Sequence, residues 1–379
     1  MPVQETLGKD NYLFINATSH FILNVNPGNY FRHSNFISAV FVAAYVFIFV
    51  LGFVGNVFVV GVVLRIRQMR TVTNYFIVNL AIADMLVILF CIPATLTSNL
   101  VTPWILGLFL CKAVAYLQGV SVCASVNTLV SISVDRFLAI CFPMRCQITS
   151  RGCRVIITAI WLFSFTITLP WTVYFKLLLI GRTEDNDQLY VCREIWPTER
   201  MGVIYFIVAN LVLCYLFPLT IILLCYIFIW RTVWRRQMPG EGVHNNGMIH
   251  RSKIKVIKML FIVVLVFMGS WLPLYAIFTR IKVGEPYQEN SMEEFIIQVS
   301  SPIAQWLGAS NSCMNPVLYA FFNNKFRAGF RTVLFPRKPC FENAGNIRMF
   351  SLRNQTVGTS ARTRRASSLQ KDNGKTNAI

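Results

Sequence analysis

Seven long apolar runs constrain this chain more than any other feature. Each run holds at least the roughly 20 mostly apolar residues that a helix needs to cross a bilayer. The runs are Phe36–Leu64, Tyr75–Leu100, Leu108–Cys141, Val155–Phe175, Val203–Ile229, Val256–Ile281 and Phe295–Phe322. With 55% hydrophobic and only 13% charged residues, the chain is too apolar for a soluble globule. We therefore predict an all-α membrane protein, built as a seven-transmembrane helix bundle.

The charge distribution predicts how this bundle is oriented. Most of the 35 Lys and Arg residues follow the first, third and fifth runs or lie in the tail, whereas most of the 16 acidic residues lie on the opposite face. Because basic residues mark cytoplasmic loops, we expect a multi-pass plasma-membrane protein with its N-terminus outside and its C-terminus in the cytoplasm. The net charge of +19 is then a positive-inside signal, and no nucleic-acid partner is expected. The slightly acidic outer face would favour a cationic ligand.

Four parts follow one another along the chain. We expect residues 1–35 to form an extracellular segment, 36–322 the bundle, 323–335 a short amphipathic eighth helix, and 336–379 a disordered cytoplasmic tail. In the eighth helix, Phe326 and Phe330 alternate with basic residues, a pattern that suits the lipids of the inner leaflet. The tail is rich in Ser, Asn and Arg and has little to bury, which favours disorder.

The topology also predicts three covalent features. Of the eleven cysteines, Cys111 lies at the outer start of the third run and Cys192 in the second outer loop, where thiols can oxidise. No other cysteine lies in an outer loop, so these two are predicted to form a disulfide. Asn16 begins an Asn-Ala-Thr glycosylation acceptor on the outer side. Cys340 follows the eighth helix and is a candidate for palmitoylation.

Polar residues inside the runs are candidate functional sites. Asp84 needs partners at membrane depth, and later runs offer Ser125, Asn311 and Asn315, the last two one helical turn apart. Such oxygen-rich clusters can hold an allosteric sodium ion or ordered water. A hydrogen-bonded packing core without an ion is the alternative.

A charged pair, Asp135-Arg136, ends the third run. An ionisable pair in or near hydrocarbon costs several kcal/mol unless it is satisfied, so it is a functional hypothesis by default. The alternative is an Arg whose long side chain simply extends to the headgroups.

Gln118 lies two helical turns beyond Cys111 on the same inward face. It could bond to a neighbouring helix, or it could read an amide group of a ligand at the pocket floor. The polar loop between Leu178 and Met201 carries several acidic residues. A solvated loop is the simple interpretation, but acids at a cavity mouth would also steer an Arg- or Lys-bearing ligand; they are Glu184, Asp185, Asp187, Glu194 and Glu199.

Prolines interrupt four of the later runs, at Pro170, Pro218, Pro273 and Pro316. Each proline kinks its helix and frees a carbonyl group, which allows the helix to hinge. Phe267 and Trp271 precede one kink by a turn or two, and Tyr319 follows another, so large rings lie where a hinge could move them.

Together these features resemble the rhodopsin-like (class A) G-protein-coupled receptors over nearly all of residues 36–334. The resemblance rests on motifs in the family's order, namely Gly55-Asn56, Leu80–Asp84, Cys111 with Cys192, Asp135-Arg136-Phe137, Trp161, Pro218, Trp271-Leu272-Pro273 and Asn315–Tyr319. It implies a receptor and not an enzyme, with no cofactor beyond the sodium ion considered above.

The resemblance also implies an activation mechanism. A ligand from outside contacts the pocket, Trp271 and Phe267 relay the change, and the sixth span swings outward at its inner end. Arg136 leaves Asp135, meets Tyr226 and Tyr319, and opens a cleft for a heterotrimeric G protein. Arrestin and receptor kinases are expected as further partners. The switch residues that the resemblance implies are Asp135, Arg136, Tyr226, Phe267, Trp271, Pro273, Asn315, Pro316 and Tyr319.

The pocket resembles that of the neuropeptide branch, which includes neuropeptide FF, SIFamide, orexin and neuropeptide Y receptors. Gln118 replaces the Asp of amine receptors, and Ala309 replaces the retinal-binding Lys of opsins. Many ligands of the branch end in an amide, which Gln118 and Gln305 can read with paired donors and acceptors. The implied ligand-binding set is Gln118, Gln305, Trp171, Asn210, Tyr275, Phe278, Glu194 and Glu199.

Two departures from the family carry expectations of their own. Where several members have an acid at the outer end of the sixth span, this chain has Lys282, so a peptide Arg would have to pair with Glu194, Glu199 or Glu285. Lys253 stands where some members carry an acid that restrains Arg136. We therefore expect appreciable basal activity.

Other functions remain as alternatives. A class A receptor for a non-amidated peptide or a lipid would keep the fold and change the ligand. A membrane transporter is disfavoured because no internal repeats are visible, and a channel because no ring of pore-lining charges is apparent. An enzyme is disfavoured because all four histidines lie outside the apolar runs and no nucleophile is paired with a base.

Overall fold

The computed structural model describes residues 31–143, 147–182, 188–235, 246–286, 288 and 291–334, and for residues 246–260 only the backbone. Two compact units divide the chain, Met1–Val333 and Leu334–Ile379, and the described residues belong almost entirely to the first. The predicted modification sites Asn16 and Cys340 lie outside the described residues. So do Lys253's side chain and the three loop acids at 184, 185 and 187.

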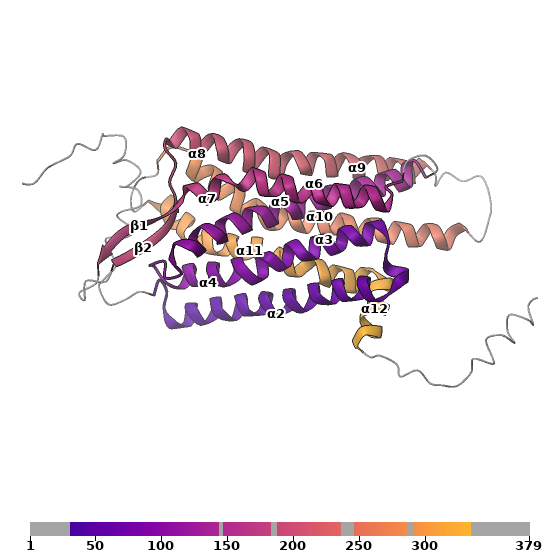
Figure 1. Cartoon of the computed structure of the whole chain (residues 1–379), viewed down its shortest axis with the longest axis horizontal. Coiled ribbons are helices and arrows are strands. Elements are labelled where there is room, and N and C mark those ends of the chain that lie inside the picture. Colours follow the sequence, from indigo (N-terminus) through magenta and orange to yellow (C-terminus); the bar gives the residue numbers. More distant parts are fainter. Residues whose placement is uncertain are drawn as a thin grey trace, which may run out of the picture. The chain divides into compact units, whose positions relative to one another are not determined.

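Seven helical stretches form the first unit and run side by side as a bundle (Figure 1). Four are single helices, and the other three are divided by short π-helical or broken segments. They are α2 (Asn35–Arg65); α3 (Val72–Leu86), η3 (Val87–Cys91) and α4 (Ile92–Leu100); α5 (Gly107–Cys141); α6 (Ser150–Thr168) and α7 (Pro170–Tyr174); α8 (Glu199–Tyr205), η4 (Phe206–Leu216) and α9 (Phe217–Arg235); α10 (Asn246–Val283); and α11 (Met292–Phe322). The 3₁₀ turn η2 (Arg67–Met69) joins the first two stretches.

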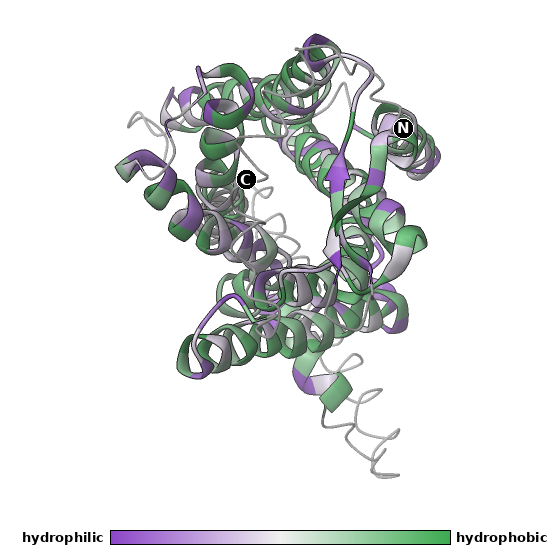
Figure 2. Cartoon of the chain, turned by 90° about the vertical axis from the view of Figure 1, so that its left-hand side faces the viewer, coloured by the Kyte–Doolittle hydropathy of each residue, from purple (hydrophilic) through white to green (hydrophobic). Residues whose placement is uncertain are grey.

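Six of the seven stretches, among the described residues, are both long and apolar enough to span a bilayer. Hydrophobic colouring covers most of the helical ribbons in Figure 2. The exception is α11, which has 31 residues but is more polar. Its polar residues point inward, since Ser310, Asn311, Ser312 and Asn315 are all buried. A helix whose polar face packs against other helices can span a membrane with a lower mean hydropathy.

Hydroxyl side chains fix where several helices begin. Thr71, Thr149, Thr198 and Ser291 each accept a hydrogen bond from the backbone N–H three residues later. Such caps satisfy one of the N–H groups that a helix start leaves without a partner. With these caps, α3, α6, α8 and α11 begin a few residues before the corresponding predicted runs begin.

Two of the four predicted prolines lie where one helical segment gives way to another, and two lie inside continuous helices. Pro170 begins α7 directly after α6 ends, and Pro218 follows the π-helical segment η4. A proline lacks an N–H and clashes with the carbonyl four residues earlier, and a π-helical turn is one way to relieve that conflict. Pro273 and Pro316 lie inside α10 and α11, which continue through them.

A close helix contact explains the glycine of the Gly-Asn motif. A Cβ atom on Gly55 would lie 2.7 Å from Cβ of Pro316, so α2 and α11 could not approach this closely with a larger residue. The neighbouring Asn56 donates from Nδ2 to the carbonyls of Gly52 and Ser312, each at 2.9 Å. The motif therefore joins the first and last stretches of the bundle.

A second set of hydrogen bonds joins three of the helical stretches. Asn79 donates to Oγ1 of Thr128 at 2.8 Å and accepts from the indole N–H of Trp161 at 2.8 Å. Asn79 and Thr128 are buried. These bonds connect α3, α5 and α6 where apolar packing alone would not specify the register.

The long polar loop expected after the fourth run contains a β-hairpin that the sequence analysis did not predict. Strands β1 (Phe175–Arg182) and β2 (Gln188–Glu194) pair antiparallel, with Leu177 opposite Cys192. Cys192 is joined to Cys111 by a disulfide, which confirms the predicted bond. The hairpin is thereby tied to the start of α5 and lies at one end of the bundle (Figure 1), which we call the hairpin end.

After α11 the chain forms the short helix α12 (Asn324–Leu334). Phe326 is buried, and Phe330 packs edge-on against Phe58 of α2 with ring centroids 6.2 Å apart. Lys325, Arg327 and Arg331 are exposed. The apolar and the basic side chains of α12 therefore lie on different sides of the helix, while its role as a lipid-facing eighth helix stays a prediction.

Candidate functional site

A cavity of about 480 Å³ opens at the hairpin end of the bundle. Its walls come from α4, α5, η4, α10, α11 and both strands of the hairpin. Seven of the eight residues predicted to bind a ligand line it, namely Gln118, Gln305, Trp171, Asn210, Tyr275, Phe278 and Glu194. They come from six separate elements, so the fold brings together residues that are up to 187 positions apart by their numbers. Glu199 does not line this cavity and is exposed at the start of α8.

Three side-chain amides face the cavity without a protein partner. Gln118 from α5, Gln305 from α11 and Asn210 from η4 are each partly buried, and none of these amides makes a hydrogen bond within the described part of the chain. Each amide offers one carbonyl acceptor and two N–H donors. Partly buried groups of this kind gain free energy when a ligand supplies the missing hydrogen bonds.

Aromatic rings form an apolar wall beside these amides. Trp271 is 7% exposed, and its indole N–H has no hydrogen-bond partner among the described residues. Tyr275 lies one turn further along α10, with its ring centroid 6.5 Å from that of Trp271, and it stacks on Tyr215 at 4.3 Å. The ring of Phe267 lies 6.4 Å from Trp271 on the side away from Tyr275 along α10. A ligand that touches Trp271 can therefore move a connected row of rings.

Gly119 leaves the space that the ring of Trp171 occupies in the cavity wall. A Cβ atom on Gly119 would lie only 2.4 Å from Cζ3 of Trp171, so the ring occupies space that any other residue at 119 would fill. The indole N–H of Trp171 donates to Oε1 of Glu194 at 3.1 Å. This contact joins the fourth stretch to the hairpin.

Glu194 makes more contacts than the sequence analysis expected. Its Oε1 also accepts from the indole N–H of Trp196 at 2.7 Å, and its Oε2 pairs with Nζ of Lys282 at 2.6 Å. Both carboxylate oxygens are therefore engaged. Sequence reasoning offered Glu194 as the partner of a ligand Arg, but in the structure Lys282 occupies that role.

The other acids proposed for a ligand cation do not face the cavity. Glu199 is exposed, and Glu285 follows α10 outside the cavity wall, where its carbonyl accepts from Arg280 at 2.8 Å. Neither residue lines the cavity. Among the described residues, the cavity therefore offers no acid that is open to a ligand cation, and the acidic subsite stays a prediction.

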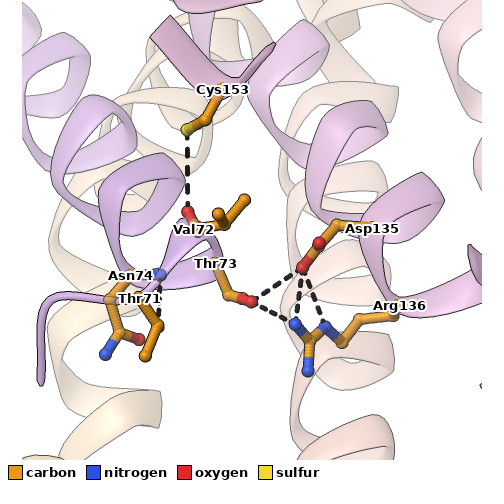
Figure 3. Close-up of polar contacts among 7 residues, drawn as sticks. All are labelled: Thr71, Val72, Thr73, Asn74, Asp135, Arg136 and Cys153. Atoms are coloured by element: carbon orange, nitrogen blue, oxygen red, sulfur yellow. Dashed lines mark hydrogen bonds and ion pairs between the residues drawn. The ribbon is translucent and has the colours of Figure 1, made fainter. Parts of the chain in front are cut away.

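A second constellation lies at the far end of α5, which we call the Arg136 end (Figure 3). Arg136 pairs with Asp135, with Nη2 2.5 Å from Oδ2. Thr73 of α3 donates to the same Oδ2 at 2.7 Å, and its hydroxyl oxygen accepts a short hydrogen bond from Arg136. Asp135 and Thr73 are thus the described partners of Arg136, and the side chains of residues 246–260 of α10 lie outside the described part of the chain.

Two tyrosines near this end have free hydroxyl groups. The hydroxyls of Tyr226 on α9 and Tyr319 on α11 are buried and make no hydrogen bond among the described residues. A buried hydroxyl without a partner costs free energy, so a conformation that supplies a donor or acceptor to it would be favoured. Both hydroxyls are therefore available as partners for Arg136 once it leaves Asp135.

The polar cluster predicted around Asp84 is buried in the middle of the bundle. Oδ2 of Asp84 accepts from Nδ2 of Asn315 at 2.8 Å. Ser125 and Asn311 are also buried, and Oδ1 of Asn311 has no hydrogen-bond partner among the described residues. Carboxylate, amide and hydroxyl oxygens are ligands that suit a hard monovalent cation.

The chain is similar to the members of a known protein family. Residues 55–319 match the family described as 7 transmembrane receptor (rhodopsin family). The chain belongs to this family. It is therefore a multi-pass membrane receptor and not an enzyme, and the two constellations described above lie at the two ends of a receptor bundle.

Several similar receptors are known by name. Neuropeptide FF receptor 2 of Rattus norvegicus is 38% identical over 319 residues, covering 82% of this receptor and 76% of the relative. Neuropeptide FF receptor 1 of Homo sapiens is 37% identical over 323 residues, with 83% and 74% covered. The RYamide receptor of Drosophila melanogaster is 36% identical over 293 residues, with 76% and 61% covered.

Sequence reasoning missed part of the receptor's cavity. Arg32 lines it, as do Cys123 and Cys214, whose sulfur atoms lie 3.5 Å apart between α5 and η4. Trp196, which bonds to Glu194, was not predicted to contribute, and Lys282 was visible only as a departure from the family. Signals of this kind identify a residue but not the partner that it meets in the fold.

Proposed function

We propose that this receptor binds an extracellular peptide that ends in an amide and activates a heterotrimeric G protein. One observation carries the proposal: Gln118 and Gln305 face one cavity with amides that make no hydrogen bond to any described residue. A terminal amide has one acceptor and two donors, so two glutamines can bind both of its sides. The relatives named for neuropeptide FF and for RYamide support a peptide ligand of this kind.

Orientation and signalling follow from the same proposal. The hairpin end, with its disulfide, faces the outside, and the basic Arg136 end faces the cytoplasm, as the distribution of Lys and Arg indicates. A ligand that favours the state with α10 moved outward shifts the equilibrium by its differential affinity for the two states. In that state Arg136 would leave Asp135 and bond to Tyr226 and Tyr319.

Further partners are part of the proposal. Arrestin and receptor kinases would act on the cytoplasmic side, and membrane lipids would contact the exposed apolar side chains of the bundle helices. The buried oxygens around Asp84 would hold a sodium ion that stabilises one conformation of the bundle, because Asn311 offers an oxygen without a protein partner.

The test is a screen for calcium and cAMP responses in cells that express this receptor. Each amidated peptide is paired with its free-acid twin, and Gln118→Ala and Gln305→Ala are compared with the wild type. The control is Gln298→Ala, because Gln298 lies on α11 two turns before Gln305 but is exposed and bonds to Glu294.

We expect amidated peptides to be at least about tenfold more potent than their acid twins, since each hydrogen bond to a charged or desolvated partner contributes about 1 kcal/mol or more. Gln118→Ala and Gln305→Ala should reduce this preference, and Gln298→Ala should not. Equal potency of the twins, or a response only to lipids, would contradict an amide-reading pocket.

A further inference from the structure

The charges that line the cavity are unequal in number. Among the described lining residues, the charged side chains are Arg32, Glu194 and Lys282. Two are cationic and one is anionic, so the lining carries a net positive charge. The sequence analysis indicated a slightly acidic outer face, which would favour a cationic ligand. The charge of the cavity lining has the opposite sign.

The acid of this set is engaged through both of its carboxylate oxygens. Glu194 accepts two indole N–H groups on Oε1 and pairs with Lys282 on Oε2, and its side chain is 17% exposed. Lys282 is more open, at 26%, and the described contacts use one of the three N–H donors of its ammonium group. A ligand cation would have to displace Lys282, whereas a ligand anion can bind donors that Lys282 still offers.

Arg32 adds to the positive character of this corner. Burial and the nearby positive charge of Arg193 lower the pKa of Arg32, so its charged form lies in an unfavourable environment. An anion that enters the cavity would improve that environment. The indole N–H groups of Trp171 and Trp196 hold the carboxylate of Glu194 in place. The carboxylate therefore stays where it is when a ligand binds.

We propose that Lys282 binds an acidic group of the ligand and thereby selects acid-bearing amidated peptides over arginine-bearing ones. The proposal rests on the function proposed above and names the second point at which the peptide is read. Lys282 is shared between Glu194 of the hairpin and the ligand carboxylate, and Arg32 supplies the second positive charge.

The spacing of residues along α10 indicates which position of the peptide carries the acidic group. Tyr275, Phe278 and Lys282 follow one face of α10, and all three line the cavity. Seven residues of helix rise about 10 Å, and an extended peptide covers that length with about three residues. The acidic residue is therefore expected about three positions before the peptide residue that contacts Tyr275.

The experiment starts from the most potent amidated peptide of the screen. Each of its positions is replaced in turn by Asp, Asn and Arg, and potency is measured on the wild type, Lys282→Gln, Lys282→Arg and the control Lys176→Gln. Lys176 is a suitable control because it lies on β1, is exposed and does not line the cavity.

At one upstream position we expect Asp to be at least about tenfold more potent than Asn or Arg, as for a charge-assisted hydrogen bond. Lys282→Gln should remove this preference, while Lys282→Arg and Lys176→Gln should retain it. Since Lys282→Gln could also disturb folding by leaving Glu194 without its cation, binding by the Asn peptide serves as the measure of an intact pocket.

The outcomes separate this inference from the proposed function. If amidated peptides activate the receptor but Asp shows no advantage, or if its advantage survives in Lys282→Gln, the role of Lys282 is wrong and the amide pocket stands. If no amidated peptide activates the receptor at all, the proposed function fails and this inference fails with it.

Discussion

Replacing Thr73 with valine is expected to raise signalling in the absence of ligand. Thr73 is the single residue outside α5 that the described contacts show restraining the Asp135–Arg136 pair. Its hydroxyl donates to Oδ2 of Asp135 at 2.7 Å and accepts from Arg136. Valine keeps the branched shape and removes both hydrogen bonds, so it weakens the restraint with little change in packing.

The magnitude follows from the burial of the pair. Hydrogen bonds to charged groups contribute about 1.5–3 kcal/mol. The Asp135 side chain is 9% exposed and the Arg136 side chain 26% exposed, so solvent takes over part of what Thr73 supplied to the arginine. We therefore take about 1.4 kcal/mol, near the lower end, as the shift between the two conformations. That corresponds to about a tenfold larger active fraction while this fraction is small.

The assay is nucleotide exchange on purified G proteins without ligand, with surface expression matched between variants. Thr73→Ser is the control, because serine retains the hydroxyl. Basal exchange by Thr73→Val that equals that of the wild type, with Thr73→Ser also unchanged, would show that Arg136 is not restrained through this hydroxyl. A rise in both variants would show that the fit of the whole Thr73 side chain, and not its hydroxyl alone, restrains the pair.

Three further predictions concern stability and the cavity. Cys192→Ser removes a disulfide across 81 residues and should lower stability by about 2–5 kcal/mol, measured as a lower Tm in detergent; an unchanged Tm would contradict it. Gly119→Ala should displace Trp171 and weaken peptide potency, whereas Gly61→Ala, which meets no atom within 4 Å, should not; equal potencies of these two variants would refute a role for the close contact. Asn79→Leu removes two hydrogen bonds inside the bundle and should lower the free energy of unfolding by about 1–3 kcal/mol. The same thermal assay measures this change, and an unchanged Tm would show that these hydrogen bonds do not stabilise the fold.

Much of the fold follows from local features of the sequence. A bilayer accepts only backbone that is satisfied within helices or closed barrels, so seven apolar runs of sufficient length already imply seven helices. Topology alone also paired Cys111 with Cys192, because no other cysteine lies in an outer loop. The position of the short helix α12 was equally readable, since its alternation of apolar and basic residues is a local pattern.

The candidate site was only partly readable in the same way. Seven of the eight predicted ligand-binding residues line one cavity, because a resemblance transfers positions on helices whose arrangement the family shares. The hairpin was not predicted, because its strands are stabilised by pairing across the loop and by the disulfide. The seventh helix is less apolar than the others for a related reason, since its polar side chains face partners that only the bundle provides.

The charge of the cavity was decided by tertiary structure alone. The sequence by itself determined that the chain spans the membrane seven times and indicated that acids outnumber bases on one side of the bundle. It could not determine that Glu194 of the hairpin would meet Lys282 of α10, 88 residues away, and lose its availability to a ligand. Electrostatic interactions depend on the distance between charges in space and on burial, and neither quantity is a property of position along the chain.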